Sequence, residues 1–230
     1  MAASQYIRLV TADPRRAATR PAATGCGGQA GGTLLFFYMD GVLAADPACR
    51  PATSCWWDDW AAAGALLKLC RSAWERRRSV PPSPPFALAS LTDLALAAEQ
   101  AVALECSGDG PGSTSTVAAG RENGPFGLLV ASDPVYDPYD EVVDLALAFA
   151  LLDLPLAVIF RGRGLFHLLR GDGEAAGRWR TLVDLTAARL YGAVAEAEHF
   201  SLAPRPAAVE WRDAAGLDEL LAGCRLLMTF

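Results

Sequence analysis

Lysine and histidine are scarce in this chain of 230 residues. Lys68 is the only lysine beside 19 arginines, which we interpret as codon usage, and His167 and His199 are the only histidines. Cys49 and Cys55 are separated by five residues, which is not the close spacing of a zinc-binding cysteine pair. We therefore expect no metal site, and the leucine-rich surroundings of His167 favour a packed or hydrogen-bonded side chain over a ligand.

Long apolar runs and common catalytic motifs are also missing. The stretch 145–160 comes closest to a membrane span, but Asp153 and Pro155 interrupt it. The serine motif Gly-x-Ser-x-Gly does not occur, and residues 161–164 lack the glycine spacing of a dinucleotide loop. A tight turn is favoured there over a phosphate site. These patterns argue against a membrane protein, a serine hydrolase and a flavin- or nucleotide-binding protein, and we expect no cofactor.

Neither a signal sequence nor a disulfide framework is expected. The first ten residues lack the apolar core of a signal peptide, so a cytoplasmic location follows by default. In a cytosolic chain of this size the cysteines are expected as reduced thiols. They are Cys26, Cys49, Cys55, Cys70, Cys106 and Cys224. The net charge of −6 argues against direct nucleic-acid binding.

Apolar sequence is abundant, at 52% of residues, and it follows one pattern twice. Residues 6–14 read Tyr-Ile-Arg-Leu-Val-Thr-Ala-Asp-Pro, and residues 126–134 read Phe-Gly-Leu-Leu-Val-Ala-Ser-Asp-Pro. Each half thus opens with an apolar strand that ends in Asp-Pro, and a second apolar strand follows. Between the halves, 107–124 is rich in Gly, Ser and Thr and is typical of a linker. We therefore predict one domain at 1–106 and another at 125–230.

Strands that alternate with helical stretches predict two tandem three-layer α/β/α domains with mostly parallel sheets. The predicted second strands are 34–38 and 156–160, the helices 91–100, 140–152, 179–191 and 217–223, and the closing strands 101–106 and 225–230. The first crossover helix is expected within 15–32, distorted by Pro21 and several glycines. A loop is expected at 46–54, and a helix with three tryptophans at 55–60, where tryptophan indicates either core or a subunit contact.

The stretch 66–78 carries the strongest chemical signal. It reads as a short buried strand, then Cys70, then a basic helix with Arg71, Arg76, Arg77 and Arg78. A helix N-terminus and nearby guanidinium groups both favour the thiolate, which is the reactive form of cysteine. The alternative is a cysteine packed as a small hydrophobe, with the arginines on a solvated helix end. Residues 80–85 are expected to form a loop near Cys70 that could gate it.

A resemblance adds to this interpretation. Residues 35–42 read Leu-Phe-Phe-Tyr-Met-Asp-Gly-Val, and they are followed by a tryptophan region and then by Cys70 with Arg76 and Arg77. This arrangement resembles the sulfur-relay family of the DsrE (TusD) type, in which the cysteine carries a persulfide. Arg78 departs from the pattern, because the family usually has glycine there.

The second half resembles the DsrF (TusC) type of the same family, which lacks a catalytic cysteine. The residues concerned are 164–169, Gly-Leu-Phe-His-Leu-Leu, then 190–192, Leu-Tyr-Gly, and the terminal 226–230, Leu-Leu-Met-Thr-Phe. The strand that would correspond to the one before Cys70 is expected at 193–197, and it contains no cysteine.

The resemblance implies a sulfurtransferase that passes sulfane sulfur through Cys70. Arg71, Arg76 and Arg77 would supply positive charge, and Asp40 would act as a proton acceptor or a loop anchor. It further implies a homo-oligomer, with a DsrH (TusB) type subunit as a further component, and a small acceptor carrier of the DsrC (TusE) type. The sulfur would serve tRNA thiolation or sulfur oxidation, with no direct contact to nucleic acid or membrane.

Two alternatives stay open at this point. The chain could be a non-catalytic binding or assembly module that keeps the fold without the reaction. Cys26, Cys49 or Cys55 could also cooperate with Cys70, by resolving a persulfide or forming a reversible disulfide.

Overall fold

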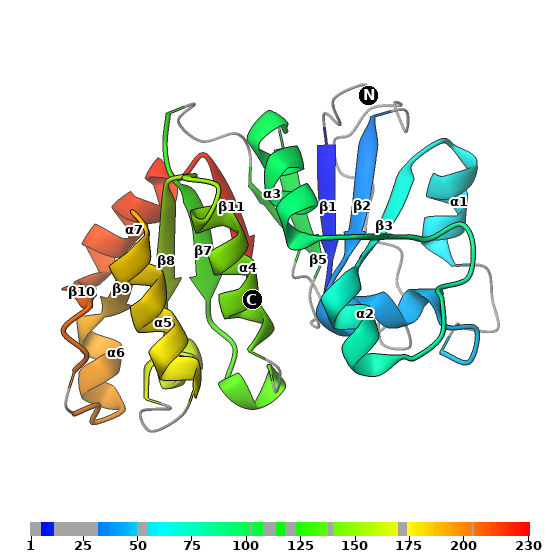
Figure 1. The fold of residues 1–230 in the computed structure, drawn as a ribbon. Helices are drawn as coiled ribbons and strands as arrows, with labels where there is room; N and C mark the ends of the chain where they lie inside the picture. Colours follow the sequence, from blue (N-terminus) through cyan, green and yellow to red (C-terminus); the bar gives the residue numbers. More distant parts are fainter. Residues whose placement is uncertain are drawn as a thin grey trace. The chain divides into compact units, whose positions relative to one another are not determined.

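The computed structural model describes residues 6–11, 32–49, 55–101, 103–107, 114–117, 123–137, 140–169, 174–203 and 205–230. The chain divides into two compact units, Met1–Thr116 (unit 1) and Val117–Phe230 (unit 2), which are described separately. Each unit contains a mostly parallel sheet with helices around it, so the predicted fold class of two tandem α/β/α domains is confirmed (Figure 1).

Unit 1 is built on a sheet with the strand order β4-β3-β2-β1-β5-β6. The pairs from β4 through β5 are parallel, and their apolar sequences suit burial on both faces. The strands are β1 (Tyr6–Val10), β2 (Thr33–Phe37), β3 (Leu66–Cys70), β4 (Ala87–Ala89), β5 (Ala103–Ser107) and β6 (Thr114–Val117). The helical segments are η1 (Met39–Ala45), α1 (Trp56–Ala62), α2 (Arg71–Arg77) and α3 (Leu91–Gln100). Strand β6 lies within the stretch predicted as a linker.

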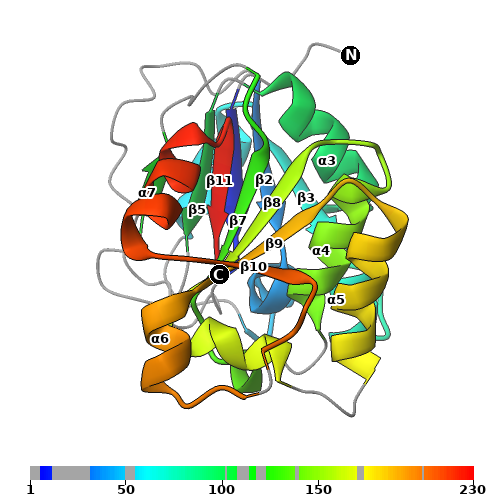
Figure 2. The ribbon, with the colours of Figure 1, turned by 90° about the vertical axis from the view of Figure 1, so that its left-hand side faces the viewer.

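Unit 2 has a five-stranded sheet in the order β10-β9-β8-β7-β11, and all four strand pairs are parallel. The strands are β7 (Phe126–Val130), β8 (Leu156–Phe160), β9 (Arg189–Ala193), β10 (Val209–Arg212) and β11 (Leu226–Thr229). The helical segments are η2 (Pro134–Tyr136), α4 (Glu141–Ala150), η3 (Gly162–Leu168), α5 (Glu174–Leu185), α6 (Val194–His199) and α7 (Ala214–Gly223). Figure 2 shows α4 and α5 on one side of the sheet and α6 and α7 on the other.

The two units repeat one construction. The order β4-β3-β2-β1-β5 corresponds to β10-β9-β8-β7-β11. The turn after the second strand is also repeated: the Tyr38 and Arg161 amides donate to the last carbonyl of the first strand, at 2.8 and 3.0 Å. The next residues, Met39 and Gly162, both have positive φ, of 51° and 53°. The repeat therefore extends from the sheet to the turn at its carboxyl edge.

Two predicted elements of unit 2 were wrong at their boundaries. The helix predicted at 179–191 ends at Leu185, and Arg189–Ala193 form β9. The strand predicted at 193–197 is instead the end of β9 and the start of α6. A continuous apolar run suits a buried strand as well as a helix, and the parallel pairing of β9 with β8 selects the strand. The first crossover helix, predicted within 15–32, falls almost wholly outside the described residues.

Aromatic packing dominates the described core of unit 1. Trp57 is 1% exposed, and its ring meets those of Phe37 and Trp56 edge-on, at centroid distances of 6.1 and 5.4 Å. Arg8 lies over the rings of Trp56 and Trp60 at 5.7 and 5.5 Å. Two of the three tryptophans are therefore interior residues of unit 1, as the core alternative predicted.

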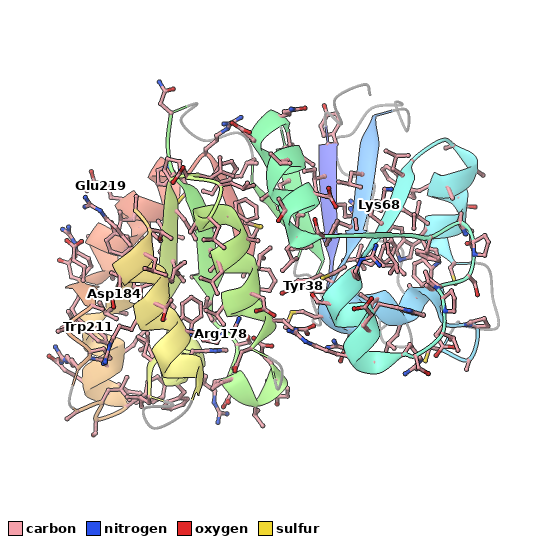
Figure 3. All side chains as sticks on the ribbon, viewed as in Figure 1. Tyr38, Lys68, Arg178, Asp184, Trp211 and Glu219 are labelled. Atoms are coloured by element: carbon pink, nitrogen blue, oxygen red, sulfur yellow. The ribbon has the colours of Figure 1, made fainter. Side chains whose placement is uncertain are left out.

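Ion pairs and a buried carboxylate fix the helices of unit 2. Arg178 on α5, which is labelled in Figure 3, forms an ion pair with Asp144 on α4. Asp137, 1% exposed, precedes α4 and accepts the amide N–H groups of Glu141 and Val142 at 2.7 and 2.9 Å. Burial raises the pKa of Asp137 to about 6, against the lowering effect of these two hydrogen bonds.

We expect the contribution of Asp137 to the stability of unit 2 to fall as the pH rises from about 4 to about 6. The pKa of Asp137 is higher in the folded state than its ordinary value of 3.8, so protonation favours folding and the stabilisation is lost through that window. About 2 pKa units correspond to about 3 kcal/mol. Relative to wild type, Asp137→Asn should therefore gain on the order of 2–3 kcal/mol between pH 4 and pH 7 in urea unfolding. If the free energies of unfolding of wild type and Asp137→Asn change in parallel with pH, the raised pKa of Asp137 is contradicted.

Candidate functional site

The candidate site lies at the carboxyl edge of the unit 1 sheet. Because β2 and β3 are parallel neighbours, the residues that follow them meet at one edge. Cys70 is the last residue of β3 and the N-cap of α2, and Tyr38 begins the turn into η1 after β2 (Figures 1 and 3). The predicted order of strand, cysteine and basic helix is confirmed, and Asp40 lies in the first turn of η1.

Cys70 is buried, with 1% of its surface exposed. Its sulfur lies 3.2 Å from the hydroxyl oxygen of Ser72, so the thiol has a polar neighbour in the first turn of α2. The backbone at Cys70 has φ −58° and ψ 118°, which turns the chain from strand to helix. An incoming reagent can reach this sulfur only if the surrounding segment moves.

Arg71, Arg76 and Arg77 lie on α2, and Arg71 and Arg77 each form an ion pair with a carboxylate. Arg71 is exposed, and its Nη1 lies 3.8 Å from Oε1 of Glu75, one turn along the helix. The Arg77 side chain is 9% exposed; its Nε donates to Asp40 Oδ1 at 2.9 Å and its Nη1 to the Ala73 carbonyl at 3.2 Å. This geometry gives Asp40 the position of an anchor between η1 and α2. Arg76 is exposed on the last turn of α2.

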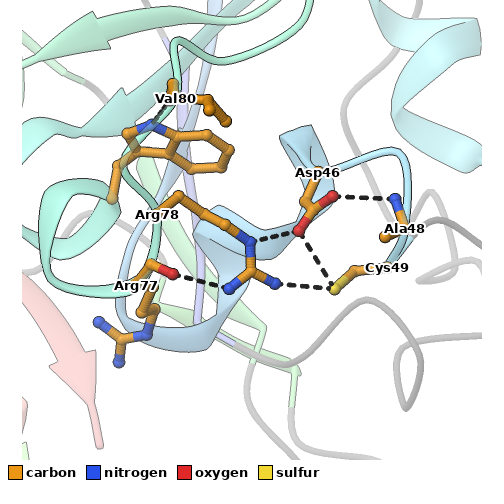
Figure 4. Close-up of polar contacts among 7 residues, drawn as sticks. Asp46, Ala48, Cys49, Arg77, Arg78 and Val80 are labelled. Atoms are coloured by element: carbon orange, nitrogen blue, oxygen red, sulfur yellow. Dashed lines mark hydrogen bonds and ion pairs between the residues drawn. The ribbon is translucent and has the colours of Figure 1, made fainter.

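A second cluster, Asp46–Arg78–Cys49, was not anticipated from the sequence. Arg78 is the C-cap of α2, and its guanidinium donates to Asp46 Oδ2, to the Arg77 carbonyl at 2.7 Å and to Cys49 Sγ at 3.2 Å (Figure 4). Asp46 also accepts the Ala48 amide at 2.9 Å, which is an Asx turn. The Asp-Pro turn signal at 46–47 was the only part of the cluster that the sequence could reveal.

Electrostatics favour the charged forms of this cluster. Burial alone would raise the pKa of Asp46, but the Ala48 amide and the Arg78 guanidinium together hold the pKa below its ordinary value. The hydrogen bond to Asp46 raises the pKa of Arg78, against the effect of burial. Asp46 and Arg78 therefore form a partly buried ion pair that favours the charged form of both side chains.

The other cysteines differ in their surroundings. Cys55 is buried at the N-cap of α1, where it forms a capping box with Asp58. Cys224 is buried at the end of α7, its thiol donates to the Leu220 carbonyl at 3.2 Å, and burial raises its pKa to about 11. Cys26 lies outside the described residues, and only the backbone of Cys106 is described. Cys49, Cys55, Cys70 and Cys224 form no disulfide.

Unit 2 has a different site at the equivalent edge. Ala193 ends β9 and caps α6, as Cys70 ends β3 and caps α2. The charge pattern is reversed, because α6 carries Glu196, whose carboxylate accepts Arg161 Nη2 at 3.2 Å and the Gly162 amide at 2.6 Å. Residues 161–164 thus form a turn held by carboxylates, in agreement with the predicted turn.

No family model matches the chain, and no curated protein matches it. Across the described ranges, no helix is both long and apolar enough to cross a membrane. The same ranges contain no group of three or more His, Cys, Asp or Glu side chains that could hold a metal ion.

Proposed function

We propose that the protein is a sulfur carrier that holds sulfane sulfur as a persulfide on Cys70. The observation that carries the proposal is the contrast between the two repeats. The fold accepts alanine where β9 meets α6, so the cysteine where β3 meets α2 is not required by the architecture. It stands at the carboxyl edge of a parallel sheet, where ligands and reacting groups commonly lie, and it begins a helix with three arginines.

The reaction is a thiol–persulfide exchange. The Cys70 thiolate attacks the outer sulfur of a donor persulfide, R–S–SH, a new S–S bond forms, and the donor leaves as R–S⁻. The outer sulfur keeps its proton, and an acceptor thiolate then takes it by the same displacement, which regenerates the Cys70 thiolate. No net oxidation or reduction occurs. Arg71, Arg76 and Arg77 would favour the anionic sulfur, while Asp40 would hold Arg77 in place.

The resemblance to the DsrE (TusD) and DsrF (TusC) types supplies the setting of the proposal. Unit 1 would do the chemistry and unit 2 would act as scaffold and interface in a cytoplasmic homo-oligomer, with a DsrH (TusB) type subunit as a further component. The acceptor would be a carrier of the DsrC (TusE) type, and the sulfur would serve tRNA thiolation or sulfur oxidation.

Intact mass spectrometry tests the proposal. After incubation with a persulfide donor, wild type is expected to gain the mass of one sulfur atom, and Cys70→Ser is expected to gain none. Cys224→Ser is the matched control, because it also removes a buried thiol but should load like wild type. An adduct of equal yield on Cys70→Ser would assign the chemistry to another cysteine.

A non-catalytic binding or assembly module is the second candidate. It is favoured by the burial of Cys70 and by the pairing of Arg71 and Arg77 with carboxylates. The same experiment separates the two functions, since a module without the reaction would stay unmodified in all three proteins.

A further inference from the structure

The burial of Cys70 means that any reaction at its sulfur must follow a local opening. Cys70 is 1% exposed, and α2 begins at the next residue. Helix α2 has seven residues, and a helix of that length is not stable without tertiary contacts. The contacts that hold α2 therefore control how often the Cys70 sulfur becomes reachable.

The end of α2 is tied to both ends of η1. Arg77 binds Asp40 in the first turn of η1, and Arg78 binds Asp46 at its C-cap. Arg78 makes more contacts than its ion pair with Asp46 alone, because its guanidinium also donates to the Arg77 carbonyl and to Cys49 Sγ. Three acceptors from two segments thus converge on one guanidinium, an arrangement that the single ammonium of lysine cannot reproduce.

We propose that the Asp46–Arg78–Cys49 cluster is a latch that holds α2 against η1 and limits access to Cys70, with Arg78 as a positioning residue. The proposal deepens the function proposed above and rests on it for its biological meaning. Release of the latch frees the C-terminal end of α2, and local opening at the other end of this short helix then exposes the sulfur of Cys70.

Arg78→Met tests the latch, because it keeps an unbranched apolar stem and removes the charge and the hydrogen-bond donors of the guanidinium. Alkylation of Cys70 and of Cys55, a buried thiol in the same unit, is followed by peptide mass spectrometry with fragmentation. We expect Cys70 to react about tenfold faster than in wild type, the size of one lost charge-assisted hydrogen bond, and the Cys55 rate to stay unchanged. The rate of Cys70 alkylation in Arg78→Lys should lie between the rates in wild type and in Arg78→Met.

Arg212→Met is the matched control, since it removes an exposed arginine that pairs with Glu210 in unit 2. An unchanged Cys70 rate in a folded Arg78→Met protein overturns the proposal. So does a parallel acceleration of Cys55, which would indicate general loosening of unit 1. These rates require no sulfur transfer, so failure of the latch and failure of the carrier function are distinguishable.

A measurement on wild type keeps the test decisive if Arg78→Met does not fold. The rate of Cys70 alkylation is measured in increasing, sub-denaturing urea and compared with that of Cys55. Local opening exposes little surface and depends weakly on urea, whereas global unfolding depends strongly on it. We expect the logarithm of the Cys70 alkylation rate to rise less steeply with urea concentration than that of Cys55. Equal slopes for the two cysteines would overturn the proposal.

Discussion

Gly41→Ala is expected to destabilise unit 1 by about 3 kcal/mol or more, the upper range for forced overpacking. A Cβ at this position would lie 2.0 Å from the carbonyl oxygen of Val10 and 2.8 Å from its carbon. Both atoms belong to the backbone of β1, so no side-chain rotation relieves the clash. The turn into η1 would have to move away from the sheet edge that carries the candidate site.

Gly164→Ala offers the matched experiment in unit 2, because its Cβ would lie 1.9 Å from the Val130 carbonyl oxygen. Gly177→Ala is the control, since nothing lies within 4 Å of a Cβ there and glycine inside α5 costs about 0.5–1 kcal/mol relative to alanine. In urea unfolding, the free energy of unfolding should thus fall by a large amount in Gly41→Ala and Gly164→Ala and rise slightly in Gly177→Ala. Wild-type stability in Gly41→Ala would refute the close approach of η1 to β1.

Moving the cysteine to the other repeat is expected to abolish sulfur loading. In the double variant Cys70→Ser/Ala193→Cys, the thiol would again end the third strand of a unit and cap a short helix. Its surroundings differ in charge: α2 carries Arg71, Arg76 and Arg77, whereas α6 carries Glu196 and Glu198. Nearby carboxylates disfavour a thiolate, so the cysteine at 193 should stay protonated near neutral pH.

The measurement for this prediction is the mass of the double variant after incubation with the persulfide donor, with circular dichroism to confirm folding. The expected result is no sulfur adduct and slower alkylation than at Cys70. Loading equal to wild type would mean that position at the sheet edge suffices, and that the basic residues of α2 contribute nothing.

Sequence patterns were sufficient to predict the doubled α/β architecture and the position of Cys70 between strand and helix. Continuous apolar runs such as 126–130 and 156–160 become buried parallel strands, and Ser90 caps α3, as short polar side chains commonly do. These features are local, because they depend on residues within a few positions of one another.

The remaining features depend on contacts between distant residues. Arg78 meets Asp46 across 32 positions, and Arg77 meets Asp40 across 37, so neither ion pair leaves a pattern in one sequence. The burial of Cys70 is of the same kind, since a cysteine at a strand end is compatible with either exposure or burial. The three-residue strand β4 is too short to give a period, and the sequence analysis placed no strand there.

Locating the added sulfur by peptide mapping tests the central claim most directly. Trypsin cleaves after Lys68 and Arg71, so the peptide 69–71 contains Cys70 and no other cysteine. After incubation of wild type with a persulfide donor and capping of all thiols, we expect the extra sulfur on this peptide. An unmodified 69–71 peptide, with the sulfur on a peptide that carries another cysteine or on none, would contradict the assignment of Cys70 as the sulfur carrier.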